Sequence, residues 1–133
     1  MKKKAIVAIA LLLCILCVNY ALAVSHPLSP FTVTTKTAQY ITNEAKADGE
    51  QKWFVTILSM SITENDVLYL NVRKSVYGDR LSKAIRFRTA AAKSADYDIT
   101  TVAGQRIYLH AQLGSKNWTP DSFVVVSSGR WSP

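Results

Sequence analysis

The stretch QRIYLHAQL, residues 105–113, decides the fold of this chain. Every second residue from Ile107 to Leu113 is apolar, and the residues between them are polar or aromatic. Successive side chains of a β-strand point to opposite faces, so this alternation predicts a strand with one buried face. The stretches VLYLNVRK (67–74) and AIRFRT (84–89) alternate in the same way. A shift of one residue would bury their arginines, so the pattern also predicts which face is inside.

Three further stretches, 31–37, 52–59 and 122–128, are rich in the β-branched and aromatic residues that strands favour. The last two are apolar on both faces, which predicts strands at the centre of a sheet or strands covered from outside. Residues 39–51 are expected to extend the first strand and then loop, and residues 90–95 to form a helical turn or a loop. The chain therefore predicts an all-β fold, a single antiparallel β-sandwich or jelly-roll-like domain of about 6–8 short strands.

The N-terminus predicts export. Three lysines at positions 2–4 precede the apolar run 5–18, and Ala21-Leu22-Ala23 fits a cleavage site, as in a secretory signal peptide. We expect a signal peptide at 1–23, a short leader at 24–30 and the domain at 31–133, with an uncleaved N-terminal anchor as the alternative. The predicted mature protein is extracellular or cell-wall-associated and has no stable transmembrane segment.

Cleavage would also change composition and charge. Both cysteines, Cys14 and Cys17, lie in the predicted signal peptide, so the mature chain has no disulfide, thiolate nucleophile or cysteine-ligated metal. Removing Lys2, Lys3 and Lys4 lowers the formal net charge from +7 to +4. A mildly basic secreted protein is expected to meet anionic cell-surface polymers and lipids, and not nucleic acid.

Sequence patterns of catalysis are scarce. The chain has no H-E-x-x-H, G-x-S-x-G or P-loop motif, and its two histidines are His26 and His110. His110 could form a hydrolase triad with Asp96 or Asp98 and a serine, but a surface histidine explains it as well. The acidic pairs at 64/66 and 96/98 accompany turn residues, which favours a turn role over catalysis or calcium binding. The sequence therefore predicts no enzyme, no metal and no cofactor.

The polar faces of the alternating strands form the candidate binding surface. Its members are the outward residues Tyr69, Asn71, Arg73, Arg86, Arg88, Arg106, Tyr108 and His110. Guanidinium groups suit phosphates and carboxylates, and tyrosine rings suit sugars or lipid interfaces, so anionic cell-wall polymer, lipid or carbohydrate are the expected partners. A solvated face with cross-strand polar pairs is the alternative. Trp118, in a loop, is a candidate aromatic anchor or a cap on the sandwich.

The stretches KWFVTILS, DVLYLNVRK, RLSKAIRFRTA, YDITTVAGQRIYLHAQLGS and the terminal SGRWSP resemble a family of short secreted bacterial proteins. That family, mainly Gram-positive, is known as a domain of unknown function. The resemblance implies export, one β-rich domain and no assigned activity. In size, charge and β content the chain also resembles secreted β-sandwich bacteriocins of the lactococcin type.

These observations favour a secreted, non-enzymatic protein that acts at the cell envelope or on extracellular anionic polymer or lipid. A bacteriocin-like antimicrobial protein and a small extracellular hydrolase are the alternatives. At the C-terminus, Gly129 is expected to turn the chain with a positive φ after a central strand. Arg130 should then face solvent and Trp131 should close one end of the core.

Overall fold

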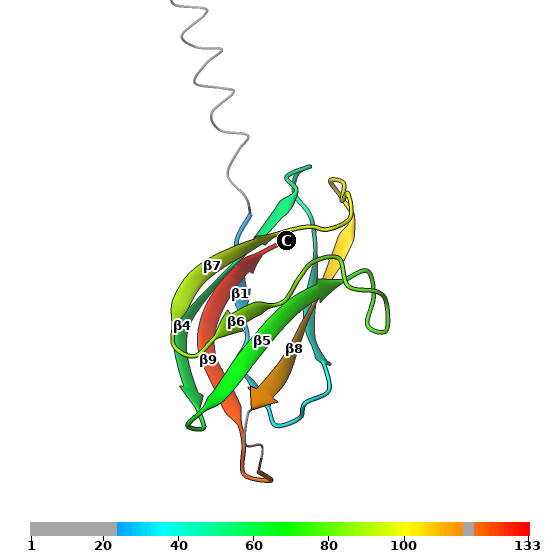
Figure 1. Ribbon diagram of the computed structural model, residues 1–133. Coiled ribbons are helices and arrows are strands. Elements are labelled where there is room, and N and C mark those ends of the chain that lie inside the picture. The colour runs from blue at the N-terminus through cyan, green and yellow to red at the C-terminus, as the bar shows by residue number, and fades with distance from the viewer. Residues whose placement is uncertain (1–23, 116–118) are drawn as a thin grey trace, which may run out of the picture.

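The structure is a computed structural model that describes residues 24–115 and 119–133, in which every regular element is a β-strand (Figure 1). The predicted signal peptide, 1–23, and Trp118 lie outside the described residues. The nine strands are β1 (His26–Leu28), β2 (Phe31–Val33), β3 (Gln39–Ala45), β4 (Lys52–Ile62), β5 (Asp66–Arg73), β6 (Ile85–Phe87), β7 (Ala91–Asp96), β8 (Arg106–Ser115) and β9 (Val124–Ser132).

These strands form two antiparallel sheets packed face to face (Figure 1). One sheet has the order β1-β9-β4-β7, with β2 also paired to β9, and is called the β9 sheet below. The other has the order β3-β8-β5-β6 and is called the β8 sheet. The prediction of an antiparallel β-sandwich is confirmed. The described chain has nine strands, whereas about 6–8 were expected.

Three segments differ from the sequence expectations. The stretch 24–30, expected as a leader, contains β1, which pairs with β9 in the register His26↔Trp131. Residues 39–45 form a separate strand in the β8 sheet and do not extend β2. Residues 91–96 form β7, an edge strand paired with β4. Alanine is a weak strand former, so here pairing with a buried neighbour outweighs local preference.

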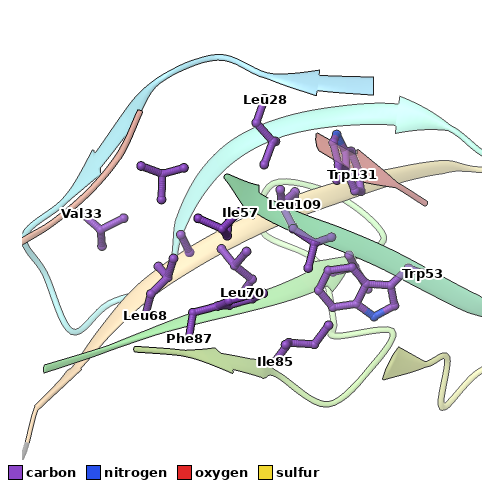
Figure 2. Close-up of a cluster of buried hydrophobic side chains, with 14 of the residues drawn as sticks. Leu28, Val33, Trp53, Ile57, Leu68, Leu70, Ile85, Phe87, Leu109 and Trp131 are labelled. Carbon is purple, nitrogen blue, oxygen red and sulfur yellow. The ribbon is translucent and has the colours of Figure 1, made fainter. Parts of the chain in front are cut away.

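The core lies between the sheets and follows the predicted alternation. Side chains at every second position of β5, β6 and β8 point inward and are buried (Figure 2). They are Leu68, Leu70, Val72, Ile85, Phe87, Ile107, Leu109, Ala111 and Leu113. Trp53 and Ile57 of β4 meet them from the opposite sheet. The predicted register of the alternating strands is therefore confirmed.

The two strands predicted as central do lie inside their sheet. β4 pairs with β7 on one side and β9 on the other, and β9 pairs with β4 and with β1 and β2. Trp53, Val55 and Ile57 point into the core, while Phe54 and Leu58 face outward. Leu58 is 61% exposed, so no element of the described chain covers this part of the sheet.

The C-terminal strand buries Trp131, whose side chain is 1% exposed, and leaves Arg130 at the surface, as predicted. The expected turn at Gly129 is wrong. Gly129 lies within β9 and has no positive φ; Gly104 is the described glycine that has one. Gly129 is opposite Ile57, beside a register shift in β4. A Cβ there would lie 2.7 Å from the Thr56 carbonyl oxygen, so close strand packing requires glycine.

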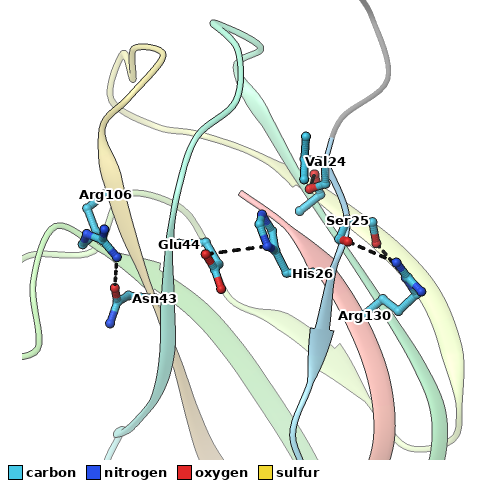
Figure 3. Close-up of polar contacts among 8 residues, drawn as sticks. Val24, Ser25, His26, Asn43, Glu44, Arg106 and Arg130 are labelled. Atoms are coloured by element: carbon cyan, nitrogen blue, oxygen red, sulfur yellow. Dashed lines mark hydrogen bonds and ion pairs between the residues drawn. The ribbon is translucent and has the colours of Figure 1, made fainter.

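The first described residues are attached to the end of β9 (Figure 3). The Arg130 side chain donates hydrogen bonds to the Ser25 hydroxyl (3.0 Å) and the Ser25 carbonyl (3.1 Å). Ser132 Oγ donates to the Val24 carbonyl oxygen (2.9 Å). His26 Nδ1 lies 3.6 Å from the Glu44 carboxylate, which joins the two sheets at this edge. Val24 to Leu28 therefore belong to the domain.

Candidate functional site

The outward face of the β8 sheet carries basic and aromatic side chains and no acidic ones. The outward positions of β5, β6 and β8 contain no Asp or Glu. Asp79, in the loop after β5, is paired with Lys74 (3.4 Å). We call this surface the arginine face. Its members are Arg73, Arg80, Arg86, Arg88 and Arg106.

Two predicted members of the site, Asn71 and His110, are buried. The loop between β5 and β6 covers them: His110 Nε2 donates a hydrogen bond to the Val76 carbonyl oxygen (2.8 Å). His110 Nδ1 lies 3.4 Å from the Tyr108 carbonyl oxygen. The expectation that these side chains belong to an exposed outer face is therefore wrong. Alternation shows that a residue points away from the core, but it does not show whether a loop covers it.

Arg73 is held in place by its neighbours. Its Nε donates to Asn71 Oδ1 (3.1 Å) and its Nη1 donates to the Gly78 carbonyl oxygen (3.3 Å). Asn71 Nδ2 has no hydrogen-bond partner among the described residues. The guanidinium is thus fixed at the base of the loop, half-buried, with its remaining nitrogen without a hydrogen-bond partner in the described chain.

Arg86 and Arg88 are two exposed members of the arginine face. They line a hollow of about 330 Å³ with Lys93, which reaches it from β7 of the other sheet. Lys93 Nζ donates to the Arg86 carbonyl oxygen (2.5 Å) and lies 5.1 Å from the centre of the Phe87 ring. Three cationic side chains therefore gather around one hollow, where they can meet a phosphate or carboxylate.

The Tyr69 side chain packs on the sheet and is not fully exposed. Its ring lies against Gly114, where a Cβ would collide with it, and the Arg86 guanidinium lies 6.0 Å from the ring centre. Tyr69 is half-buried in this arrangement. We infer that it supports Arg86 through a cation–π contact.

Tyr108 and Arg106 make contacts with β3. The Tyr108 ring centre lies 6.1 Å from that of Tyr40. Arg106 Nη1 donates to Asn43 Oδ1 (2.5 Å), and this pair is visible in Figure 3. Arg106 remains exposed beyond this bond, whereas Tyr108 is half-buried. The three predicted site residues of β8 thus differ: Arg106 is exposed, Tyr108 is half-buried against Tyr40, and His110 is buried.

A groove of about 550 Å³ lies between the start of β3 and the loop after β5. It is lined by Thr37, Ala38, Gln39, Tyr40, Arg73, Val76, Tyr77 and Gln112. We call it the tyrosine groove. Of these residues the sequence prediction named Arg73 alone, because Tyr77 stands in a turn and Tyr40 in a stretch without a clear pattern. The sequence signal that could have identified Tyr77 is an aromatic residue next to a glycine, Gly78, in a predicted turn.

The catalytic set considered from the sequence is not assembled. Asp96 lies on β7 of the β9 sheet and pairs with Lys52 (3.6 Å), whereas His110 lies on the other sheet. Asp98 is exposed and its backbone nitrogen donates to Leu81. Within residues 24–115 and 119–133, no three His, Cys, Asp or Glu side chains gather as metal ligands would. The same residues include no helix long and apolar enough to span a membrane.

A buried titratable pair, Lys46 and Tyr97, lies away from the arginine face. Lys46 Nζ donates to the Glu50 carbonyl oxygen (2.7 Å) and lies 4.6 Å from the Tyr97 ring centre. Burial lowers the pKa of Lys46, against the opposing effect of Asp48 and Glu50. Burial also raises the pKa of Tyr97, and Asp48 adds to this rise. The Tyr97 hydroxyl is buried without a hydrogen-bond partner in the described chain.

Replacing Tyr97 by phenylalanine is expected to leave the protein equally stable or up to about 1–3 kcal/mol more stable at neutral pH, because an unpaired buried hydroxyl is removed. In the wild-type protein, the folded state disfavours the ionised form of Tyr97. The free energy of unfolding therefore falls as the pH rises above about 10, where the tyrosine ionises in the unfolded chain. The variant should lose this alkaline slope. Urea unfolding at neutral and alkaline pH measures both effects. Lys46 contributes the opposite slope in both proteins, so the difference between them isolates Tyr97.

Together, the fold and this surface define a β-sandwich protein with a basic outer face. No protein-family profile and no curated protein matches the chain. Its fold is similar to part of a chain in the crystal structure of the T13 IBDV viral particle, at 8% identity and a TM-score of 0.41. The similar region covers 81% of this chain and 30% of the viral chain.

Proposed function

We propose that the protein is a secreted, non-enzymatic binding protein that acts at the cell envelope. Its arginine face would hold anionic polymers or lipids of the extracellular surface. The supporting observation is that the arginines of this face have no acidic partner. The ion pairs among the described residues involve His26, Lys52 and Lys74, and no arginine. Arginines that lack acidic partners attract phosphate and carboxylate groups from solution.

The two ends of the arginine face support different contacts. Arg86, Arg88 and Lys93 surround an open hollow that suits a charged group on a chain or headgroup. Arg73 is fixed beside the tyrosine groove, where a ring could lie against Tyr77. A polymer that carries both charges and rings would contact both parts, whereas a lipid surface would use the exposed arginines.

The double substitution Arg86→Gln/Arg88→Gln is expected to weaken binding to anionic vesicles by about thirtyfold. Each cation near an anionic surface contributes about 1 kcal/mol, so two contribute about 2 kcal/mol. Sedimentation with phosphatidylglycerol vesicles, and with cell walls bearing teichoic acid, measures the effect. Wild-type binding should fall steeply as salt rises, because the contacts are at the surface.

The matched control is Lys52→Gln/Arg130→Gln, which removes the same charge from the outer face of the β9 sheet. Binding equal to wild type in this control assigns the effect to the arginine face and not to net charge. If both double variants weaken binding equally, attraction is non-specific and the proposed site is wrong. If the wild-type domain sediments with neither vesicles nor walls at low salt, the proposed function is wrong.

A further inference from the structure

We propose that the tyrosine groove binds a sugar unit that carries an anionic substituent. This inference rests on the proposed function and names the chemistry of one part of its surface. In this arrangement the sugar ring would lie on the Tyr77 ring, its hydroxyl groups would meet two glutamine side chains, and its anionic group would meet Arg73.

The aromatic walls carry the first part of the argument. Tyr77 is 96% exposed at the edge of the groove, and Tyr40 is 40% exposed on the other side. A tyrosine this exposed contributes almost nothing to the core, and its large flat ring offers apolar area to the C–H face of a sugar. The Tyr40 ring is kept in place by contacts with Tyr108 (6.1 Å) and His110 (5.9 Å) between ring centres.

The polar side chains of the groove carry the second part. Each is anchored by a hydrogen bond at one polar atom and has another polar atom without a hydrogen-bond partner in the described chain. Gln39 Nε2 donates to the Thr32 carbonyl oxygen (3.0 Å), which leaves its amide oxygen as an acceptor. Gln112 Oε1 accepts from Arg80 Nη2 (3.5 Å), which leaves its amide nitrogen as a donor. Arg73 is held from two sides, so its free nitrogen is presented in a fixed position.

Hydrogen bonds hold the loop that forms one wall of the groove. The hydrogen bond from His110 to Val76 ties the loop after β5 to the sheet. Gly78 N donates to the Ser75 carbonyl oxygen and closes a turn within the same loop. A preformed site loses less conformational entropy on binding than a mobile one.

Size and charge define the class of ligand. The volume of about 550 Å³ is in the range of small-molecule sites and exceeds what a single phosphate needs. The lining has one cation and no carboxylate, so an anionic ligand is favoured over a cationic one. Amide groups beside aromatic rings suit hydroxyl groups on a ring better than they suit an acyl chain.

The test is isothermal titration calorimetry of the described domain with four probes: trigalacturonate, glucose 1-phosphate, maltotriose and inorganic phosphate. We expect the first or second to bind more tightly than the neutral sugar and than phosphate alone. Preference between them identifies the source of the charge as carboxylate or phosphate. Tyr77→Ala should weaken this binding by about tenfold, whereas Tyr77→Phe should keep it, because stacking needs the ring and not the hydroxyl. Ile99→Ala, at another exposed apolar position, is the control and should bind like wild type.

The inference is overturned if neither acidic sugar binds, if maltotriose or phosphate alone binds as well as they do, or if Tyr77→Ala binds like wild type. Failure of this inference can be distinguished from failure of the proposed function, because the two are tested by different variants and different ligands. Arg86→Gln/Arg88→Gln should weaken vesicle binding and keep sugar binding, whereas Tyr77→Ala should weaken sugar binding and keep vesicle binding. Vesicle binding that persists while no sugar binds would remove the groove assignment alone.

Discussion

Replacing Trp131 by alanine is expected to lower the free energy of unfolding by about 3–5 kcal/mol. The side chain is 1% exposed and belongs to the same buried hydrophobic cluster as Leu109 and Trp53 (Figure 2). Its indole nitrogen has no hydrogen-bond partner in the described chain, so the loss is one of packing and of the cavity left behind. Small domains are stable by about 5–15 kcal/mol, so this single change removes a large part of the total.

Urea unfolding followed by circular dichroism measures this loss, since Trp131 cannot serve as its own probe after substitution. Trp131→Phe should lose less, because a ring still fills most of the space. Leu58→Ala, at an exposed apolar position of the neighbouring strand, is the matched control and should change stability by less than about 0.5 kcal/mol. Equal stability of Trp131→Ala and wild type would show that the indole does not close the core.

Replacing Gly129 by valine is the second large effect, with an expected cost of about 3 kcal/mol. A Cβ at this position would lie 2.7 Å from the Thr56 carbonyl oxygen and 3.2 Å from Leu28 Cδ1. The Thr56 oxygen belongs to the backbone of a central strand, so it cannot move aside as the end of a flexible side chain would. The side chain would force β9 away from β4, the partner along most of its length.

Thermal unfolding by calorimetry measures this cost, and Gly49→Val is the matched control. Nothing lies within 4 Å of a Cβ at Gly49, and its φ is not positive, so this control should melt within a few degrees of wild type. If the two variants melt at the same temperature, close packing of β9 on β4 at Gly129 is not a constraint on the fold.

Alternation in the sequence was enough to predict the sandwich and its inward residues, because each alternating strand has one buried face. It failed where a strand lacks that pattern. β7 is rich in alanine and forms because it can pair with β4. β1 contains Pro27, which an edge strand tolerates because the missing N–H need not form a hydrogen bond. These strands depend on neighbours distant in the sequence, which local patterns do not record.

The candidate site was predicted only in part for a similar reason. The arginines of β6 and β8 are exposed as the alternation indicates, and Arg73 is near the groove that it helps to line. His110 and Asn71 alternate in the same way, yet the loop after β5 lies over them. Tyr77 sits in that loop. Its place opposite Tyr40 depends on how the loop after β5 folds back over the sheet, and residue spacing in the sequence does not predict this.

The position of β9 sets the order in which this molecule can fold. β9 lies at the centre of its sheet and pairs with β1, β2 and β4. The bonds from Arg130 to Ser25 span 105 residues, so contact order is high and loop closure is costly. β1 and β2 join β4 in one sheet only through β9, so residues 124–132 must be in place before this sheet is complete. Such long-range pairing is associated with slow folding, so this sheet is expected to form more slowly than a helical domain of similar size.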